Sequence, residues 1–198
     1  DPLLLEQLDY LRRKRKARIL EILDKLLKDN IFISEADVER ESNGGSPGRP
    51  HLANLMYVNG YVKSRQDAFD KYLRKGARAY VPKVKLEASK AIKLINDAGG
   101  VAAIAHPHSL NIQDHDKLFE VISSLVEMGM KAIEAYYPAH TPAQTEMFLG
   151  IARKLNLIVT GGTDFHGANK PGIELGVFPG IDQIPYSVVT KIKNSLSQ

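Results

Sequence analysis

The sequence predicts an α/β fold in which parallel βα units follow a helical region. From Ala88 onward, stretches with helical apolar periodicity alternate with short apolar strands, which is typical of parallel βα units. Before about Arg78 the pattern indicates helices and loops only. The chain has 198 residues, 43% of them hydrophobic and 25% charged, which is enough for one sizeable core or for one domain with an added module. We therefore expect a mostly helical region at 1–77 and a βα region at 78–198.

The first predicted element is a long amphipathic helix from Leu3 to about Lys28. Most basic residues of the run at 12–18 lie on the polar face of this helix, where they form either a solvated surface or a contact to nucleic acid. The run contains no aromatic residues that could stack on bases, which favours the solvated surface. Arg15 differs because it falls inside the apolar stripe, where its guanidinium needs an anion or must reach past the stripe to water. The stripe consists of Leu4, Leu8, Leu11, Ile19, Ile22, Leu23 and Leu26.

Shorter helices complete the helical region. Ser34 is a predicted N-cap, followed by acidic residues in the first helical turn, and Ser64 is predicted to open a further helix. Between them Pro50 suits the start of a helix that Arg49 precedes and His51 continues. A helix N-terminus beside an arginine and a histidine is a natural anion site, although both side chains could equally well only decorate the helix start.

The βα region is predicted from apolar runs that are separated by helix caps and glycines. The expected strands are Val101–Ala105, Ala132–Tyr136 and Leu157–Thr160, and the expected helices are Ala88–Ala98, Asp114–Met128, Thr141–Asn156 and Tyr186–Leu196.

Ligand-capable side chains follow the strands of this region. His106 comes after the first strand, Glu134 and His140 lie within and after the second, and Asp164 and His166 come after the third. The carboxyl ends of parallel strands meet at one rim, so these side chains are expected to converge there.

The pair at Asp164 and His166 is the strongest signal, since residues two apart in extended chain point to the same side. Taken alone, such a pair could be a cap and a solvated histidine. Together with His106 it predicts a metal site, because carboxylate and imidazole suit zinc, manganese or iron. His108 and His115 are interpreted as surface residues, with His108 a candidate to support the site from behind its ligands.

The overall composition limits the classes of function. The chain has no cysteine, which excludes disulfides and thiolate metal sites and fits a cytoplasmic protein. Its net charge of +4 favours anionic partners. No apolar run approaches the length of a membrane span, so no membrane partner is expected.

Two segments resemble the polymerase and histidinol phosphatase (PHP) family, in its branch of small bacterial metal-dependent phosphoesterases. They run from Val101 to Pro107 and from Thr160 to Gly167, and the resemblance extends to the segments at 48–51 and 136–140. It implies a distorted, TIM-like βα barrel with metal ions at its carboxyl rim, of which this chain is the C-terminal half, preceded by a helical insertion.

The resemblance also implies roles for individual residues. His106, Asp164 and His166 would bind two or three divalent metal ions (Mn, Zn or Fe), and Arg49, His51 and His140 would contact the substrate phosphate. Arg15 is added as a phosphate contact because of its place in the apolar stripe, and not from the resemblance. His51 or His140 would also serve as a proton donor in catalysis. A hydroxide bound to the metals would attack phosphorus in a nucleotide, another phosphorylated small molecule or a short RNA end.

The chain departs from the family pattern in two places. It lacks the opening strand with its His-X-His motif, and His108 replaces the usual glycine after the Ala-His-Pro triplet. Since the first residue is Asp1, we expect a fragment that is a weak metal binder and a poor enzyme until the missing part of the same barrel is supplied. Two alternatives are a non-catalytic nucleotide- or nucleic-acid-binding module with a degenerate barrel, and an interaction protein that completes the barrel of another chain.

Overall fold

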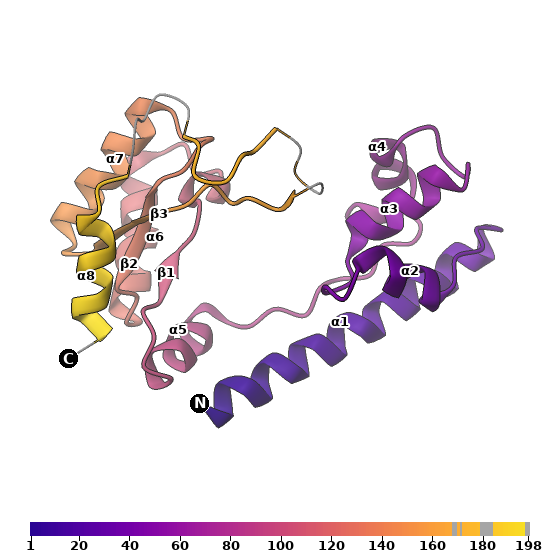
Figure 1. The fold of residues 1–198 in the computed structure, drawn as a ribbon, viewed down its shortest axis with the longest axis horizontal. Coiled ribbons are helices and arrows are strands. Elements are labelled where there is room, and N and C mark those ends of the chain that lie inside the picture. The colour runs from indigo at the N-terminus through magenta and orange to yellow at the C-terminus, as the bar shows by residue number, and fades with distance from the viewer. Residues whose placement is uncertain (168–169, 171, 179–183, 197–198) are drawn as a thin grey trace. The chain divides into compact units, whose positions relative to one another are not determined.

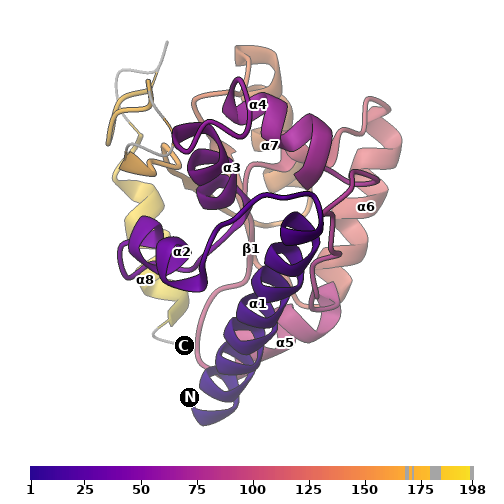
Figure 2. The same cartoon turned by 90° about the vertical axis from the view of Figure 1, so that its right-hand side faces the viewer.

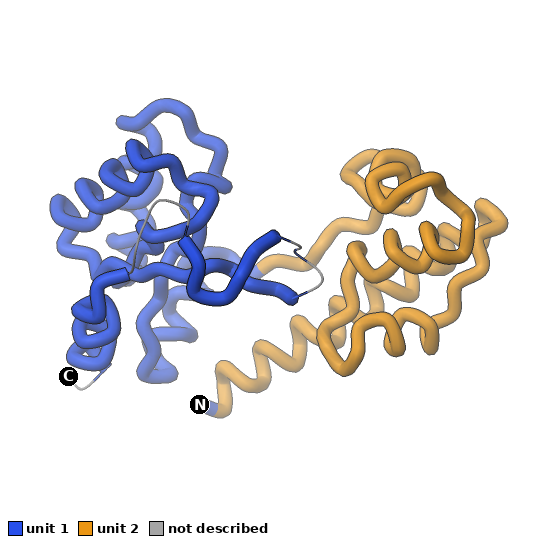
Figure 3. Tube along the Cα trace, turned by 45° about the horizontal axis from the view of Figure 1, so that its top comes forward, with its two compact units in different colours: residues 1, 86–198 blue, residues 2–85 orange. Residues whose placement is uncertain are grey.

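The computed structural model describes residues 1–167, 170, 172–178 and 184–196. The chain forms two compact units, which Figure 3 shows in different colours. Pro2–Lys85 make up one, here called the helical unit, and Leu86–Gln198 together with Asp1 make up the other, here called the βα unit. No helix in these described ranges is both long enough and apolar enough to cross a membrane.

The helical unit is built from four helices and one π-helical turn (Figure 1). Its core contains Ile19, Ile22 and Leu26 of the first helix, whereas Leu8 at the other end of the apolar stripe is 39% exposed. The predicted stripe is therefore buried within this unit only over its second half. The elements are α1 (Pro2–Lys28), α2 (Glu35–Ser42), α3 (Arg49–Val58), α4 (Arg65–Ala68) and the π-helical turn Phe69–Leu73.

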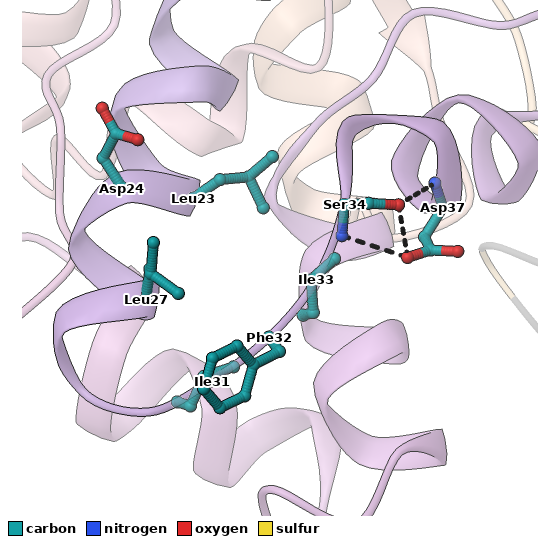
Figure 4. A pocket seen from close by; sticks show the side chains of 8 residues that line it. All are labelled: Leu23, Asp24, Leu27, Ile31, Phe32, Ile33, Ser34 and Asp37. Atoms are coloured by element: carbon teal, nitrogen blue, oxygen red, sulfur yellow. Dashed lines mark hydrogen bonds between the residues drawn. The ribbon is translucent and has the colours of Figure 1, made fainter.

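The predicted N-cap at Ser34 is confirmed. The Ser34 hydroxyl accepts the Asp37 N–H at 3.1 Å, and the Asp37 carboxylate accepts the Ser34 N–H at 3.0 Å, so the two residues form a capping box. Figure 4 shows these bonds beside a pocket lined by the end of α1 and the chain that leads into α2. None of the predicted site residues is among its lining side chains.

The boundary between the two units lies after Lys85, later than the predicted boundary at 77/78. Ala79 and Val81 explain the difference, because both are buried in the core of the helical unit. The connecting chain therefore packs on the helices before it enters the βα unit.

The βα unit contains a three-stranded parallel sheet in the order β1-β2-β3, with helices between the strands (Figures 1 and 2). α7 packs against β2 and β3, and α8 packs against β3. The predicted alternation of helices and parallel strands is confirmed, and closure into a barrel remains a prediction. The elements are α5 (Ala88–Asp97), β1 (Ala103–Ile104), a 3₁₀ turn (Pro107–Leu110), α6 (His115–Glu127), β2 (Ala132–Tyr136), α7 (Pro142–Lys154), β3 (Ile158–Gly161) and α8 (Ser187–Leu196).

Register and core packing fix the strand ends relative to one another. Ile133 in the central strand pairs with Ile104 of β1 and with Val159 of β3. Ile133 and Phe148 of α7 are both fully buried in the core of the unit. The carboxyl ends of the three strands therefore form one rim, and the side chains that follow them face a common region.

Candidate active site

His106 leaves β1 in an unusual conformation. Its φ of 32° lies in the left-handed region, and Pro107 then begins the 3₁₀ turn. A non-glycine residue held there costs roughly 1–3 kcal/mol, and such strain is concentrated at functional sites. The imidazole Nδ1 lies 3.0 Å from the Ser109 hydroxyl, which orients the ring.

Glu134 of β2 holds the backbone of His106. Its carboxylate accepts the His106 N–H at 2.5 Å. Burial raises the pKa of the Glu134 carboxyl, and the bond from His106 opposes this shift. The end of β3 passes close by, since a Cβ placed on Gly162 would lie 3.3 Å from Glu134 Oε1. Glu134 thus bonds to the end of β1 and lies beside the chain that leaves β3.

The chain after β3 turns instead of continuing as extended strand. Asp164 has φ 53°, so the expected alternation of an extended segment is wrong here. The turn nevertheless brings the two side chains together: His166 Nδ1 lies 2.7 Å from the Asp164 carbonyl and 3.4 Å from its carboxylate. The pair that the sequence suggested is therefore made by a turn.

Asp164 is held by two further groups. Lys170 Nζ lies 2.6 Å from its Oδ2, and the Tyr137 hydroxyl donates to the same oxygen at 3.2 Å. The hydrogen bond from Lys170 is the main reason why the pKa of the Asp164 carboxyl lies below its ordinary value. At neutral pH the carboxylate is ionised and has a cation beside it.

Tyr137 connects the two sides of this rim. Its buried ring lies 5.7 Å from the ring of His106, while its hydroxyl reaches Asp164 and accepts a hydrogen bond from Lys170 at 3.0 Å. Sequence reasoning placed Glu134 among the ligand-capable side chains of this rim without giving it a role, and it did not select Tyr137, which follows β2. The pairing of β2 with β3 shifts register between Glu134 and Tyr136, so the side chains at this end of β2 do not follow the regular alternation of a strand.

Two histidines form an aromatic cluster behind the rim. The ring of His108 stacks on the ring of Tyr137, with the ring centroids 5.2 Å apart. It meets the ring of His140 edge-on, with the centroids 5.0 Å apart. His108, expected at the surface with a supporting role, is only partly exposed, because the 3₁₀ turn folds it back over Tyr137 and its Nδ1 is buried. His115 is exposed, as expected.

His140 is fixed by its Nδ1, which lies 2.9 Å from the Ala135 carbonyl. A carbonyl oxygen can only accept a hydrogen bond, so Nδ1 carries the ring proton. In the neutral ring the buried Nε2 is then an unprotonated hydrogen-bond acceptor, without a partner among the described residues. Burial lowers the pKa of both His140 and His108, which favours neutral rings at pH 7.

The side chains at the rim have the donor chemistry of a metal site. His106, Asp164 and His166 offer imidazole nitrogens and a carboxylate, which suit zinc, manganese or iron. Within the described residues, no three or more such side chains are grouped closely enough to hold a metal ion as they stand. The ammonium of Lys170 instead lies against the carboxylate of Asp164.

The other predicted site residues belong to the helical unit. Arg49, the first residue of α3, donates to the Leu73 carbonyl at 2.8 Å. His51 Nδ1 accepts the Gly48 N–H at 3.1 Å, which caps α3 and leaves the ring proton of neutral His51 on Nε2. Arg15 donates to the Ser46 hydroxyl, so within the described contacts it pairs with a neutral group.

Comparisons with known proteins find relatives whose names are those of phosphate-ester hydrolases. It is 31% identical over 175 residues to the 5'-3' exoribonuclease Rnm of Escherichia coli (strain K12), covering 88% of this chain and 59% of that protein. It is 28% identical over 159 residues to a phosphoribosyl 1,2-cyclic phosphate 1,2-diphosphodiesterase of Eggerthella lenta, covering 78% of this chain and 57% of that protein. The chain thus spans less than two thirds of either relative.

A solved structure with a similar fold is that of a protein from Bifidobacterium adolescentis assigned as a metal-dependent phosphoesterase. It aligns with a TM-score of 0.74 and 26% identity, over 94% of this chain and 64% of that one. No family model matches the chain.

Proposed function

We infer that the chain belongs to the PHP family, whose members among its relatives are hydrolases. From this premise we propose that it forms part of a metal-dependent phosphoesterase acting on nucleotides or short RNA ends. The observation that carries the proposal is that His106 and Asp164 follow two strands of one parallel sheet, and that Glu134 of the strand between them bonds to the backbone of His106. The relatives act on RNA or on a phosphorylated small molecule, which supports the substrate class.

In this proposal His106, Asp164 and His166 hold two or three divalent ions of manganese, zinc or iron. When bound, the metals supply a nucleophilic water at neutral pH and neutralise the charge that develops on the phosphate. Glu134 fixes the backbone of His106, and Tyr137 orients the Asp164 carboxylate. The remaining ligands are assigned to the half of the barrel that carries the His-X-His strand in the family.

The two histidines proposed to transfer protons both have Nδ1 occupied, but their Nε2 atoms differ in protonation. His51 has its Nδ1 occupied by the Gly48 N–H, so its Nε2–H is available to donate to a phosphate oxygen or to a leaving group. His140 has its Nδ1–H bound to Ala135, so its Nε2 must gain a proton before it can donate one. His51 is accordingly the better phosphate donor, and His140 the better proton acceptor.

Arg49 and Arg15 would bind the phosphate by charge-assisted hydrogen bonds. Arg49 is preorganised for this role, because its guanidinium lies 5.8 Å from the Phe69 ring and 5.9 Å from the Tyr80 ring and is anchored on the Leu73 carbonyl.

The test is the substitution Asp164→Asn in the complete protein, with metal content and hydrolysis of bis(p-nitrophenyl) phosphate as readouts. Both should fall, because the amide removes an anionic ligand. The control is Asp116→Asn, which changes an exposed carboxylate in the first turn of α6 and should affect neither. Unchanged metal content and activity in Asp164→Asn would contradict the assignment of this ligand.

The same assays separate the enzyme from the alternative of a non-catalytic binding module. The chain alone is compared with the chain joined to the remaining part of the barrel, and the joined protein is expected to bind metal more tightly and to be more active. A joined protein that binds nucleotides but neither binds metal nor hydrolyses phosphate esters would favour the binding module.

A further inference from the structure

The first helix, α1, carries a second stripe of residues on the face that is turned away from the core of the helical unit. Its buried side chains are Ile19, Ile22 and Leu26. On the other side of the helix, residues recur alternately three and four positions apart over almost its whole length, which is the spacing of contact positions in a coiled coil. All of them are exposed, and most are apolar or aromatic. This outer stripe consists of Leu3, Glu6, Tyr10, Arg13, Ala17, Leu20, Asp24 and Leu27.

The outer stripe exposes large apolar side chains to water. The exposed fractions are 61% for Leu3, 39% for Tyr10, 39% for Leu20 and 53% for Leu27. At the end of α1, Leu27 and Phe32 also line the pocket of Figure 4, which has a volume of about 410 Å³ and continues the apolar surface beyond the helix. Apolar side chains that repeat at contact spacing are stabilised when another helix covers them. The outer stripe therefore has the pattern of an interaction surface.

Two charged residues of the outer stripe restrict what can cover it. Arg13 and Asp24 are exposed, and within the described residues neither of them forms an ion pair, whereas the neighbouring Arg12 pairs with Asp9 at 2.8 Å. A second α1 lying parallel and in register would place arginine against arginine and aspartate against aspartate. Like charges that face each other across an interface are strongly disfavoured, so the parallel arrangement is excluded.

An antiparallel second copy of α1 matches the outer stripe in charge and in apolar spacing. When Arg13 of one copy lies opposite Asp24 of the other, Tyr10 of the first copy lies opposite Leu27 of the second. In the same register the first turn of the second copy, with its exposed Leu3, comes over the pocket beyond Leu27. Opposite charges and apolar side chains thus meet at successive contact positions.

We propose that the outer stripe is a dimerisation surface, on which a second copy of this chain packs its own α1 antiparallel, with each Arg13 opposite an Asp24. The pairing has two-fold symmetry, so every contact is made twice and the assembly closes at two chains. The partner is a second copy because the stripe is complementary to itself. Charged residues at contact positions fix the register of a coiled coil at a cost in stability, so the dimer is reversible.

Sedimentation equilibrium of the full chain tests this pairing. The measured mass should rise toward that of a dimer with protein concentration. Arg13→Glu and Asp24→Arg should each weaken the association by at least about tenfold, because like charges then face each other twice. An equal mixture of the two variants should dimerise as the wild type does, since both ion pairs form again between unlike chains. A chain that is monomeric at every concentration, a dimer that neither substitution weakens, or a mixture that stays monomeric would overturn the proposal.

The matched control is Arg12→Glu, which makes the same change of charge on the neighbouring residue, outside the outer stripe. It should leave the association within about threefold of the wild type, since screened surface charges act weakly. Circular dichroism verifies that each variant is folded. An equally large effect of Arg12→Glu would show that overall charge, and not the pairing, governs the association.

Cross-linking tests the orientation of the two helices, because the chain has no cysteine of its own. An equal mixture of Tyr10→Cys and Leu27→Cys should be joined by a short bismaleimide. Tyr10→Cys alone should not be joined, because in the antiparallel pair the two copies of this position lie about 25 Å apart along the helix axis. Efficient cross-linking of Tyr10→Cys to itself would show a parallel pair and contradict the proposal.

Discussion

Gly161, the last residue of β3, is predicted to be irreplaceable because the sheet closes tightly around it. A Cβ at this position would lie 2.6 Å from Tyr136 Cβ, 2.7 Å from Ile184 Cδ1 and 2.9 Å from the Tyr136 carbonyl oxygen. These distances are shorter than those that real Cβ atoms keep from their neighbours, and two of the three atoms belong to the paired residue of β2. The strand itself must therefore move to admit a methyl group.

The expected cost follows from this overpacking. Gly161→Ala should destabilise the βα unit by roughly 1–3 kcal/mol. The matched control is Gly150→Ala within α7, where the nearest atom to the new Cβ is the end of the Arg153 side chain at 3.9 Å. That variant should be stabilised by roughly 0.5–1 kcal/mol, because alanine favours the helix over glycine.

Urea unfolding followed by circular dichroism measures both changes. The two alanine variants should differ by roughly 1.5–4 kcal/mol, with opposite signs relative to the wild type. Gly161→Ala should also disturb Asp164, which lies three residues further along the same segment. A Gly161→Ala protein as stable as the wild type would refute the argument that β2 and β3 are closed to a side chain here.

Three other substitutions test separate parts of the structure. Lys170→Met should strengthen Zn²⁺ binding, measured by competition with a chelating dye, because the Lys170 ammonium lies against the Asp164 carboxylate; unchanged or weaker binding would contradict this. Phe148→Ala should cost roughly 3–5 kcal/mol in urea unfolding, because this ring is fully buried; a loss below 1 kcal/mol would show that the core is misassigned. Ser34→Ala should cost roughly 0.5–2 kcal/mol through loss of the helix cap. Hydrogen bonds from Ser34 are the main cause of the lowered pKa of Asp37, so in Ser34→Ala this pKa should rise in an NMR titration. A carboxyl group whose pKa is lowered by folding stabilises the folded state at pH values above its unfolded pKa of about 3.9, and this stabilisation is lost as the pH falls through the folded pKa. The Ser34→Ala variant should therefore lose less stability on acidification than the wild type. A Ser34→Ala protein with an unchanged Asp37 pKa would contradict this.

The sequence by itself determined the order and kind of the elements. Caps at Ser34, Asp114 and Thr141 give the starts of three helices, because a side-chain oxygen that satisfies the first free amides acts within one turn of chain. The strand Ala132–Tyr136 was predicted with its observed bounds, since a short apolar run in a βα alternation has few other conformations. The placement of His106 and Asp164 at strand ends follows from the same local patterns.

Only the tertiary structure decided which groups touch. Tyr137 reaches Asp164 across 27 positions in the sequence, and Glu134 reaches the backbone of His106 across 28, through contacts that depend on strand register and on two residues in left-handed conformation. Arg18 likewise meets Val81 across 63 positions. Sequence periodicity is local, whereas these contacts arise when distant segments pack, so the pattern located the rim of the site and the packed chain determined its partners.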